Sequence, residues 1–132
     1  MNTSHAHELL SQEFVPVGIA VLVVSDSRTL ETDSSGKLLE EGFWEAGHQV
    51  IERAIVPDEK EKIAQKVNAW VREEKVHCIV VTGGTGITPR DITPEAIEPL
   101  YDKPLLGFGE LFRQLSFEEI GPACIQSRAT AG

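Results

Sequence analysis

The pattern of hydrophobic and polar positions predicts the strands of one sheet. Residues 19–24 and 79–81 are apolar on both faces, which is typical of buried central strands in a parallel sheet. Residues 49–56 alternate between apolar and polar positions, so we expect this strand nearer the edge of the sheet. One side of it is expected to carry Val50, Ala54 and Val56, and the other side Ile51, Arg53 and Ile55. A last strand is expected to begin at Ile125.

Helical periodicity fills the segments between the first three strands. One helix is expected between an N-cap at residues 33–35 and a C-terminal glycine, Gly47, and its apolar face carries Leu39, Phe43 and Ala46. A second helix is expected to begin at residues 57–59. Its apolar stripe consists of Ile63, Ala64, Val67, Trp70 and Val71.

Two more helices are expected towards the end of the chain. The first is short, runs from Pro94 to about Tyr101, and has Thr93 as its N-cap. The second lies within residues 107–120, and its apolar stripe is Phe108, Leu111, Phe112 and Leu115. The alternation of strands and helices predicts a three-layer α/β/α domain with a mostly parallel sheet over residues 15–132. Residues 1–14 are polar and aperiodic, which predicts a flexible arm.

Composition narrows the class of protein. The 132 residues are enough for one domain, and the hydrophobic fraction of 41% is that of a globular chain. The net charge of −9 argues against sequence-independent binding of nucleic acid, so local donors must hold any anionic ligand. Cys78 and Cys124 lie in apolar sequence and are expected to be buried free thiols. No lysine or arginine precedes Arg28, and the apolar run near residues 15–24 is too short to span a bilayer. A cytoplasmic location without membrane contact is therefore expected.

The densest group of candidate ligand-binding residues lies within residues 82–96. Gly83, Gly84 and Gly86 permit positive φ and a close approach by a ligand, and successive amides in such a turn form an anion-binding concavity. The same loop carries hydroxyl, guanidinium and carboxylate groups at Thr82, Thr85, Thr88, Arg90 and Asp91. These groups predict a phosphate site beside a candidate magnesium ligand, the Asp91 carboxylate.

Alternatives to this interpretation come from the same residues. The loop can be a flexible turn that binds no ligand, because glycine turns are common. Two nucleotide-binding motifs are excluded. No lysine follows Gly86, as a P-loop requires, and residues 25–28, Ser-Asp-Ser-Arg, follow the first strand in place of a dinucleotide-binding G-x-G-x-x-G.

Three other positions have a structural as well as a functional interpretation. Residues 25–28 fit a ligand site at a strand end and an ordinary Ser/Asp turn equally well. Asp58 is followed by Glu61 three residues later, so the local pattern favours a helix cap. His77 is interpreted as a packed histidine, and His5 and His7 as part of a solvated tail.

Residues 82–86 and 90–96, Thr-Gly-Gly-Thr-Gly and Arg-Asp-Ile-Thr-Pro-Glu-Ala, resemble the MoaB/Mog family of molybdenum-cofactor biosynthesis proteins. Four further segments are similar to that family: Val24–Arg28, Val56–Glu59, Gly107–Glu110 and Ile125–Ala129. The segment Ser116–Gly121 looks more like the MoaB branch than the Mog branch. The resemblance runs from about Ile19 to the last residue.

The resemblance implies the molybdopterin-binding fold and an enzyme that adenylylates molybdopterin with ATP and Mg²⁺, releasing pyrophosphate. The two acidic catalytic positions of the family match Asp58 and Asp91, which are expected to share the magnesium ion. The substrate-binding residues that it implies are Ser25, Asp26, Ser27, Thr82, Gly83, Gly84, Thr85, Gly86, Arg90, Glu110, Ser127 and Arg128.

The resemblance also implies a trimer or hexamer. Family members usually continue with another strand, a Pro-Gly-Ser-Pro-type loop and a closing helix, so the chain is expected to lack these pieces. A second interpretation is a non-catalytic, molybdopterin-binding oligomer. A third is a structural subunit whose glycine loop makes contacts between subunits.

Overall fold

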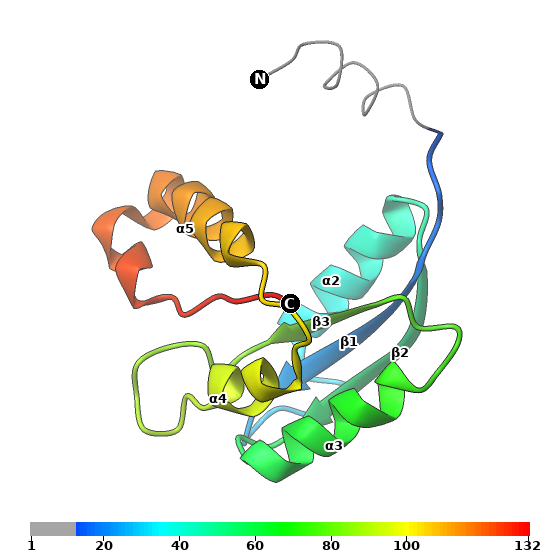
Figure 1. Cartoon of the computed structure of the whole chain (residues 1–132), viewed down its shortest axis with the longest axis horizontal. Helices are drawn as coiled ribbons and strands as arrows, with labels where there is room; N and C mark the ends of the chain where they lie inside the picture. Colours follow the sequence, from blue (N-terminus) through cyan, green and yellow to red (C-terminus); the bar gives the residue numbers. More distant parts are fainter. Residues whose placement is uncertain (1–12) are drawn as a thin grey trace.

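A computed structural model describes residues 13–132, and a three-stranded parallel sheet lies at its centre (Figure 1). The strands are β1 (Gly18–Val24), β2 (Gln49–Val56) and β3 (Cys78–Thr82), in the order β2-β1-β3. Every residue of β1 is buried, which confirms the prediction of a central strand. The same prediction for residues 79–81 is wrong. Strand β3 is only partly buried because, within the described residues, it pairs with β1 alone.

Helices cover both faces of the sheet and make three layers. Helix α2 (Ser34–Glu45) packs on the face that carries Ile19, Val21 and Val23. Helices α3 (Lys60–Val71) and α4 (Thr93–Ile97) pack on the opposite face. The buried residues on that second face are Ala20, Leu22, Val24, Ile63, Val67, Trp70 and Ala96. Alternate residues of β1 therefore serve two cores, and the predicted α/β fold is confirmed (Figure 1).

A bulge changes which side of β2 its first residues face. The pairing with β1 shifts between Ile19 and Ala20, so one extra residue of β2 is inserted there. As a result Val50 packs with Ile55 on the α2 side, not with Ala54 and Val56 on the α3 side as the alternation predicts. The prediction holds for Ala54 and Val56 and is wrong for Val50, because an insertion of one residue reverses the face of every residue before it.

The helix boundaries follow most of the expected signals. Asp33 is the N-cap of α2, and its carboxylate accepts a hydrogen bond from the Gly36 amide at 2.9 Å. Gly47, just past the helix, has a φ of 94°, as a C-terminal glycine should. The buried stripe of α3 is narrower than predicted. Its residues Ile63, Val67 and Trp70 are buried, whereas Val71, the last residue of the helix, is 67% exposed.

The C-terminal part departs furthest from the prediction. After η1 (Glu98–Leu100), helix α5 (Leu106–Ile120) leads into η2 (Gly121–Gln126). The strand expected at Ile125 is absent from the described residues, because residues 121–126 form a 3-10 helix. The segment after η2 makes isolated backbone bonds to two different loops, at Thr85 and Leu105, and these cannot form a strand ladder.

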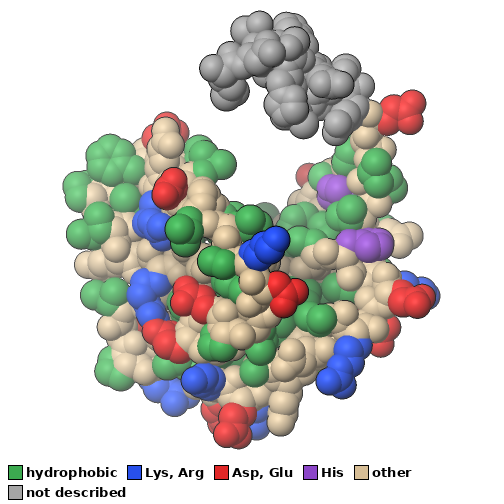
Figure 2. Space-filling view, viewed as in Figure 1, with side chains coloured by type: hydrophobic (Ala, Val, Ile, Leu, Met, Phe, Trp, Pro, Cys, Tyr) green, Lys and Arg blue, Asp and Glu red, His purple; other side chains and the backbone are tan. Residues whose placement is uncertain are grey.

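The apolar stripe of α5 is exposed. Its side chains Phe108, Leu111, Phe112 and Leu115 are between 45% and 58% exposed. Figure 2, viewed as Figure 1, shows hydrophobic side chains gathered over the region of α5 and η2. The periodicity correctly predicts the helix, but its apolar face does not pack on the sheet within the described residues.

Three smaller expectations concern single residues and the first segment. Cys124 is buried, as expected, but Cys78 is exposed because it begins the edge strand β3. His77 is also exposed, and its Nδ1 accepts a hydrogen bond from the Gly18 amide at 2.8 Å. Most of the predicted arm, including His5 and His7, lies outside the described residues. None of the helices in residues 13–132 has the length and apolar character needed to cross a bilayer.

Candidate functional site

The carboxyl ends of the three parallel strands meet at one edge of the sheet, beside α4 (Figure 1). Residues 25–28 follow β1, residues 57–59 follow β2, and residues 83–92 follow β3. Ligands of open α/β sheets bind outside this edge. The sequence therefore brings most of the predicted site residues to one place through the order of the strands, although they lie far apart along the chain.

Asp26 joins the three loops. Its Oδ1 accepts a hydrogen bond from the Asp58 amide at 3.0 Å. Its Oδ2 accepts hydrogen bonds from Arg90 Nε at 3.1 Å and from Arg90 Nη2 at 2.6 Å. The bond to Arg90 and then the bond to the Asp58 amide lower the pKa of Asp26. Asp26 and Arg90, 64 residues apart, thus form an ion pair across the site.

Asp58 lies partly buried at the end of β2, and its carboxylate does not cap a helix. The N-cap position of α3 is Glu59, and no side chain makes a capping hydrogen bond there. The cap predicted from the local pattern is therefore wrong. Burial, and then the charge of Asp26, raise the pKa of Asp58, against an opposite effect of Arg90. Within the described residues no donor makes a hydrogen bond to this carboxylate, which leaves it available to a cation.

Asp91 lies against the same loop but in a different environment. Its Oδ2 accepts hydrogen bonds from the Thr88 hydroxyl at 2.7 Å and from the Thr88 amide at 2.9 Å. These bonds, with a smaller effect of the Arg128 charge, lower the pKa of Asp91. A Cβ on Gly86 would lie 2.7 Å from Asp91 Oδ2, and one on Gly84 would lie 3.2 Å from Asp58 Oδ1. The two carboxylates therefore border neighbouring glycines of one loop.

Two of the three glycines of the loop, Gly83 and Gly84, take the positive φ that the sequence predicts, whereas Gly86 does not. Gly83 and Gly84 have φ values of 97° and 69°, which side chains disfavour, and a Cβ on Gly83 would meet the Val24 carbonyl oxygen. Thr93 holds the loop from α4. Its hydroxyl donates to the Gly83 carbonyl at 2.7 Å and its amide to the Gly84 carbonyl at 3.0 Å. The prediction that Thr93 is the N-cap of α4 is wrong by one residue, because Ile92 occupies that position and the Thr93 side chain bonds the loop.

Comparisons with known proteins identify the family of the chain. A family model described as a probable molybdopterin binding domain matches residues 20–132. Molybdenum cofactor biosynthesis protein B of Escherichia coli (strain K12) is 49% identical over 123 residues, 93% of this chain and 72% of that protein. The chain belongs to the MoaB/Mog family of molybdenum cofactor biosynthesis proteins.

Solved structures of the MoaB/Mog family place the chain nearer to the MoaB branch. A crystal structure of a molybdenum cofactor biosynthesis protein B matches with a TM-score of 0.86 at 48% identity, over 90% of this chain and 74% of that one. A structure of MogA matches with a TM-score of 0.79 at 25% identity, over 87% of this chain and 76% of that one. The predicted branch is confirmed.

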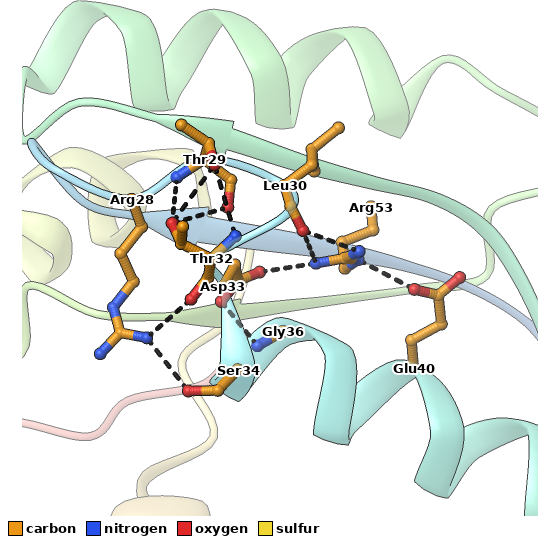
Figure 3. Close-up of polar contacts among 9 residues, drawn as sticks. All are labelled: Arg28, Thr29, Leu30, Thr32, Asp33, Ser34, Gly36, Glu40 and Arg53. Atoms are coloured by element: carbon orange, nitrogen blue, oxygen red, sulfur yellow. Dashed lines mark hydrogen bonds and ion pairs between the residues drawn. The ribbon is translucent and has the colours of Figure 1, made fainter.

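The remaining residues implied by the MoaB/Mog family lie in varied places. Ser25 Oγ accepts hydrogen bonds from the amides of Ser27 and Arg28, at 3.3 and 3.1 Å, so this segment forms a local turn. Figure 3 shows that Arg28 reaches Ser34 and Thr32, at the start of α2. Glu110 is exposed on α5 and makes no hydrogen bond or ion pair within residues 13–132. Of this group, only Arg128 is hydrogen-bonded to the glycine loop.

The sequence patterns do not predict two sets of ion pairs that the structure contains. Glu95 forms an ion pair with Arg128, 33 residues away, and no local pattern links these positions. Arg53 forms ion pairs with Asp33 at 2.9 Å and Glu40 at 2.8 Å, and Figure 3 shows it between these two residues, beside α2. The signal for this second feature is a charge at Arg53 on the side of the strand where the alternation also puts Ile51 and Ile55, since a charge among apolar side chains needs a partner.

The carboxylates fit a magnesium ion that also binds substrate phosphates better than they fit a metal ion held by protein side chains alone. In the part of the chain that the structure describes, no three His, Cys, Asp or Glu side chains are arranged to hold a metal ion. Mg²⁺ usually binds through one or two carboxylates together with substrate phosphates. Asp58 and Asp91 beside an amide-rich loop offer that set of oxygen ligands. Asp26 adds a third negative charge, and Arg90 is paired with it. The Arg128 guanidinium beside Asp91 is paired with Glu95.

Proposed function

We propose that the chain binds molybdopterin and adenylylates it with ATP and Mg²⁺, releasing pyrophosphate. The observation that carries this proposal is the pairing of two kinds of group at the carboxyl edge. A glycine loop supplies amides for a phosphate, and the Asp58 and Asp91 carboxylates border that loop. Membership of the MoaB/Mog family, and the molybdopterin-binding description of its domain model, support the choice of substrate.

The loop amides supply the anion site in this proposal. Within residues 13–132 no acceptor is found for the amides of Gly84 or Thr85. Unpaired amides in a glycine turn bind phosphate oxygens, and a local site of this kind suits a chain of net charge −9, whose overall field repels anions. The terminal phosphate of molybdopterin is therefore assigned to residues 83–86.

The carboxylates are the proposed ligands of a cation that balances the negative charge of the second substrate, ATP. Asp26, Asp58 and Asp91 carry three negative charges when ionised, and Arg90 is paired with Asp26. A divalent cation held by Asp58 and Asp91 would balance this charge and would withdraw negative charge from the ATP phosphates. Asp58 is the stronger candidate ligand, since Thr88 already occupies Asp91 Oδ2. Arg90 is placed to bind a phosphate oxygen once its partner Asp26 has another cation beside it.

The reaction then depends on position and charge. A terminal phosphate oxygen of molybdopterin attacks the α-phosphorus of ATP, one P–O bond forms, and the bond to the β-phosphate oxygen breaks as pyrophosphate leaves. The loop amides orient the attacking phosphate. Asp58 and Asp91 would hold the cation whose positive charge offsets the repulsion between the two anionic substrates. No covalent intermediate with the protein is needed.

The runner-up is a molybdopterin-binding protein that does not transfer AMP. The same loop observation favours it, because the amide site is formed by the backbone without any metal. Turnover separates the two proposals. Purified protein is mixed with molybdopterin, ATP and Mg²⁺, and pyrophosphate release and the mass of the pterin product are followed. Pyrophosphate with adenylylated pterin supports the enzyme. Tight pterin binding without either product supports the binding protein.

Assembly into a trimer or hexamer is part of the proposal. The apolar face of α5, with side chains 45–58% exposed, is a large hydrophobic surface for a small domain, and such surfaces usually mark contacts with another molecule. Light scattering at micromolar concentration is expected to show three or six chains, and a monomer would contradict this assembly. A cytoplasmic location stays a prediction.

A further inference from the structure

Arg128 directs its hydrogen bonds into the protein. The sequence implies that it binds substrate, yet Nε donates to the Gly86 carbonyl at 2.7 Å and Nη2 to the Asp91 carbonyl at 2.6 Å. Nη1 and Nη2 also bond the two oxygens of the Glu95 carboxylate. A guanidinium has five N–H donors, so these four bonds leave one donor for anything else.

Thr93 and Arg128 together bind four consecutive carbonyl oxygens of the glycine loop. Thr93 donates to those of Gly83 and Gly84, at 2.7 and 3.0 Å. Arg128 donates to those of Thr85, through its amide at 2.9 Å, and Gly86, through Nε at 2.7 Å. The C=O of one residue and the N–H of the next point in opposite directions in a trans peptide, so fixing the carbonyls of residues 83–86 also fixes the directions of the amides of residues 84–87.

Glu95 and Arg113 fix Arg128 from two sides. The carboxylate of Glu95 takes the guanidinium in a two-point arrangement, which restricts its orientation as well as its position. Arg113, on α5, donates to the carbonyls of Ser127 and Ala129, both at 3.2 Å, and so holds the backbone on either side of Arg128. Glu95 lies on α4, the helix that also carries Thr93, so one short helix supports both halves of the loop.

We propose that Arg128, oriented by Glu95, is a positioning residue that holds the glycine loop with its amides facing the bound phosphate. It acts through the carbonyls of Thr85, Gly86 and Asp91, not through the phosphate itself. This inference rests on the proposed function of the loop as the phosphate site. The competing role is direct contact, since Arg128, Glu95 and Asp91 also line a pocket of ≈ 390 Å³.

The direction in which Glu95→Gln changes molybdopterin affinity separates the two roles. Glu95→Gln removes the charge that orients Arg128 and frees part of its guanidinium. If Arg128 positions the loop, Glu95→Gln and Arg128→Met both weaken molybdopterin binding, by about 10–100-fold, the usual range for groups that orient a ligand set. Arg128→Lys keeps the charge but cannot reach three partners at once, so it weakens binding as well. If Arg128 contacts the phosphate, Glu95→Gln leaves affinity unchanged or increases it.

Two variants control for charge and for general stability. Glu98→Gln removes an exposed carboxylate near Arg128 that makes no hydrogen bond to it, and Arg72→Met removes an exposed arginine at the end of α3. Both are expected to keep the affinity of the parent. Melting temperatures are measured for all variants, so that loss of affinity is separated from unfolding.

Hydrogen exchange of the ligand-free protein provides a test that needs no pterin. The amides of Thr88, Asp91 and Thr93, which make hydrogen bonds within the loop or to it, are expected to exchange faster in Arg128→Met and Glu95→Gln, while those of β1 stay protected. Unchanged exchange at these three amides would overturn the positioning role. So would faster exchange with unchanged affinity, or weaker binding in Arg128→Met beside normal binding in Glu95→Gln. If the parent binds no molybdopterin, the proposed function fails, and exchange alone then decides whether Arg128 holds the loop.

Discussion

The protein has one group of carboxylates near α2 and another near the glycine loop, and the negative charges of the two groups are balanced in different ways. Asp33 is buried and Glu40 is half-buried, and Arg53 makes an ion pair with each of them (Figure 3). Asp26, Asp58 and Asp91 lie at the carboxyl edge, with Arg90 bonded to Asp26 alone. The first group uses its hydrogen-bonding capacity within the protein. The second leaves the Asp58 carboxylate and two loop amides without partners among the described residues.

The difference indicates which charged residues serve stability and which serve a ligand. Removing one partner of a buried ion pair destabilises the fold, because the other charge is then buried without a counter-charge. Partly exposed charges of one sign, gathered without enough counter-charge, usually mark a functional site. The pKa directions follow the same division within the edge group. The pKa of Asp58 is raised mainly by burial, and that of Asp91 is lowered mainly by its bonds to Thr88.

The largest expected effect is on turnover. Asp58→Asn and Asp91→Asn each remove one charge from the proposed magnesium site with little change of shape, and adenylylation is expected to slow by about 10²–10³-fold. Molybdopterin affinity should change little, because that phosphate is assigned to the loop amides and not to the carboxylates. The matched variant Glu40→Gln, in the other group, should keep normal turnover. Pyrophosphate release and pterin affinity are measured side by side, and full turnover in Asp58→Asn would remove that residue from the metal site.

The next effect is on the free energy of unfolding. Here the larger change is expected for the group around Arg53 and the smaller change for the group at the carboxyl edge. Arg53→Met leaves the buried Asp33 carboxylate without its cation and is expected to lower the free energy of unfolding by about 3 kcal/mol. Arg90→Met removes an exposed arginine and should change it far less. Urea denaturation gives both values. Equal losses in the two variants would show that Arg90 is as much a part of the fold as Arg53.

The smallest effect is a pH-dependent change in stability of opposite sign at Asp58 and Asp91. Because the folded pKa of Asp58 is raised, its ionised form opposes folding, and this cost is present at neutral pH and disappears below the unfolded pKa of about 3.9. Asp58→Asn is therefore expected to raise the melting temperature slightly at pH 7, with no gain near pH 3.

The folded pKa of Asp91 is lowered, so its charge favours folding above the unfolded pKa and that contribution is lost as the pH falls through the folded pKa. Asp91→Asn should lower the melting temperature at pH 7, and the loss should shrink in acid. Melting curves from pH 3 to 7 test both variants. Shifts of the same sign would contradict the two environments described here.

How far the sequence predicts these features depends on the range of the interactions. Hydrophobic periodicity predicts β1, α2 and α3, because these elements bury one face or both faces and the pattern is local. It fails at Val50, where a bulge inserts one residue, and at Ile125, because residues 121–126 form a 3-10 helix. Periodicity marks the apolar face of α5 but cannot say what covers it.

The candidate site divides in the same way. The glycine loop is visible in the sequence, since only glycine accepts the positive φ of Gly83 and Gly84 readily. Asp58 looks like a helix cap from its neighbours, and the family resemblance alone assigns it to the site. The bonds of Arg128 to Glu95, Gly86 and Asp91 span 33 to 42 residues and have no local signature. Such contacts exist only after the strand order is fixed.

Binding of a non-reacting ATP analogue with and without Mg²⁺ tests the proposed role of the edge carboxylates most directly. The α,β-methylene analogue is titrated calorimetrically into the parent chain, Asp58→Asn and Glu40→Gln, each saturated with molybdopterin. In the parent and in Glu40→Gln, Mg²⁺ is expected to increase affinity for the analogue by about tenfold or more, since it offsets the negative charge of the site. Asp58→Asn should lose most of that increase. Equal affinity with and without Mg²⁺ in the parent would contradict a magnesium site formed by Asp58 and Asp91.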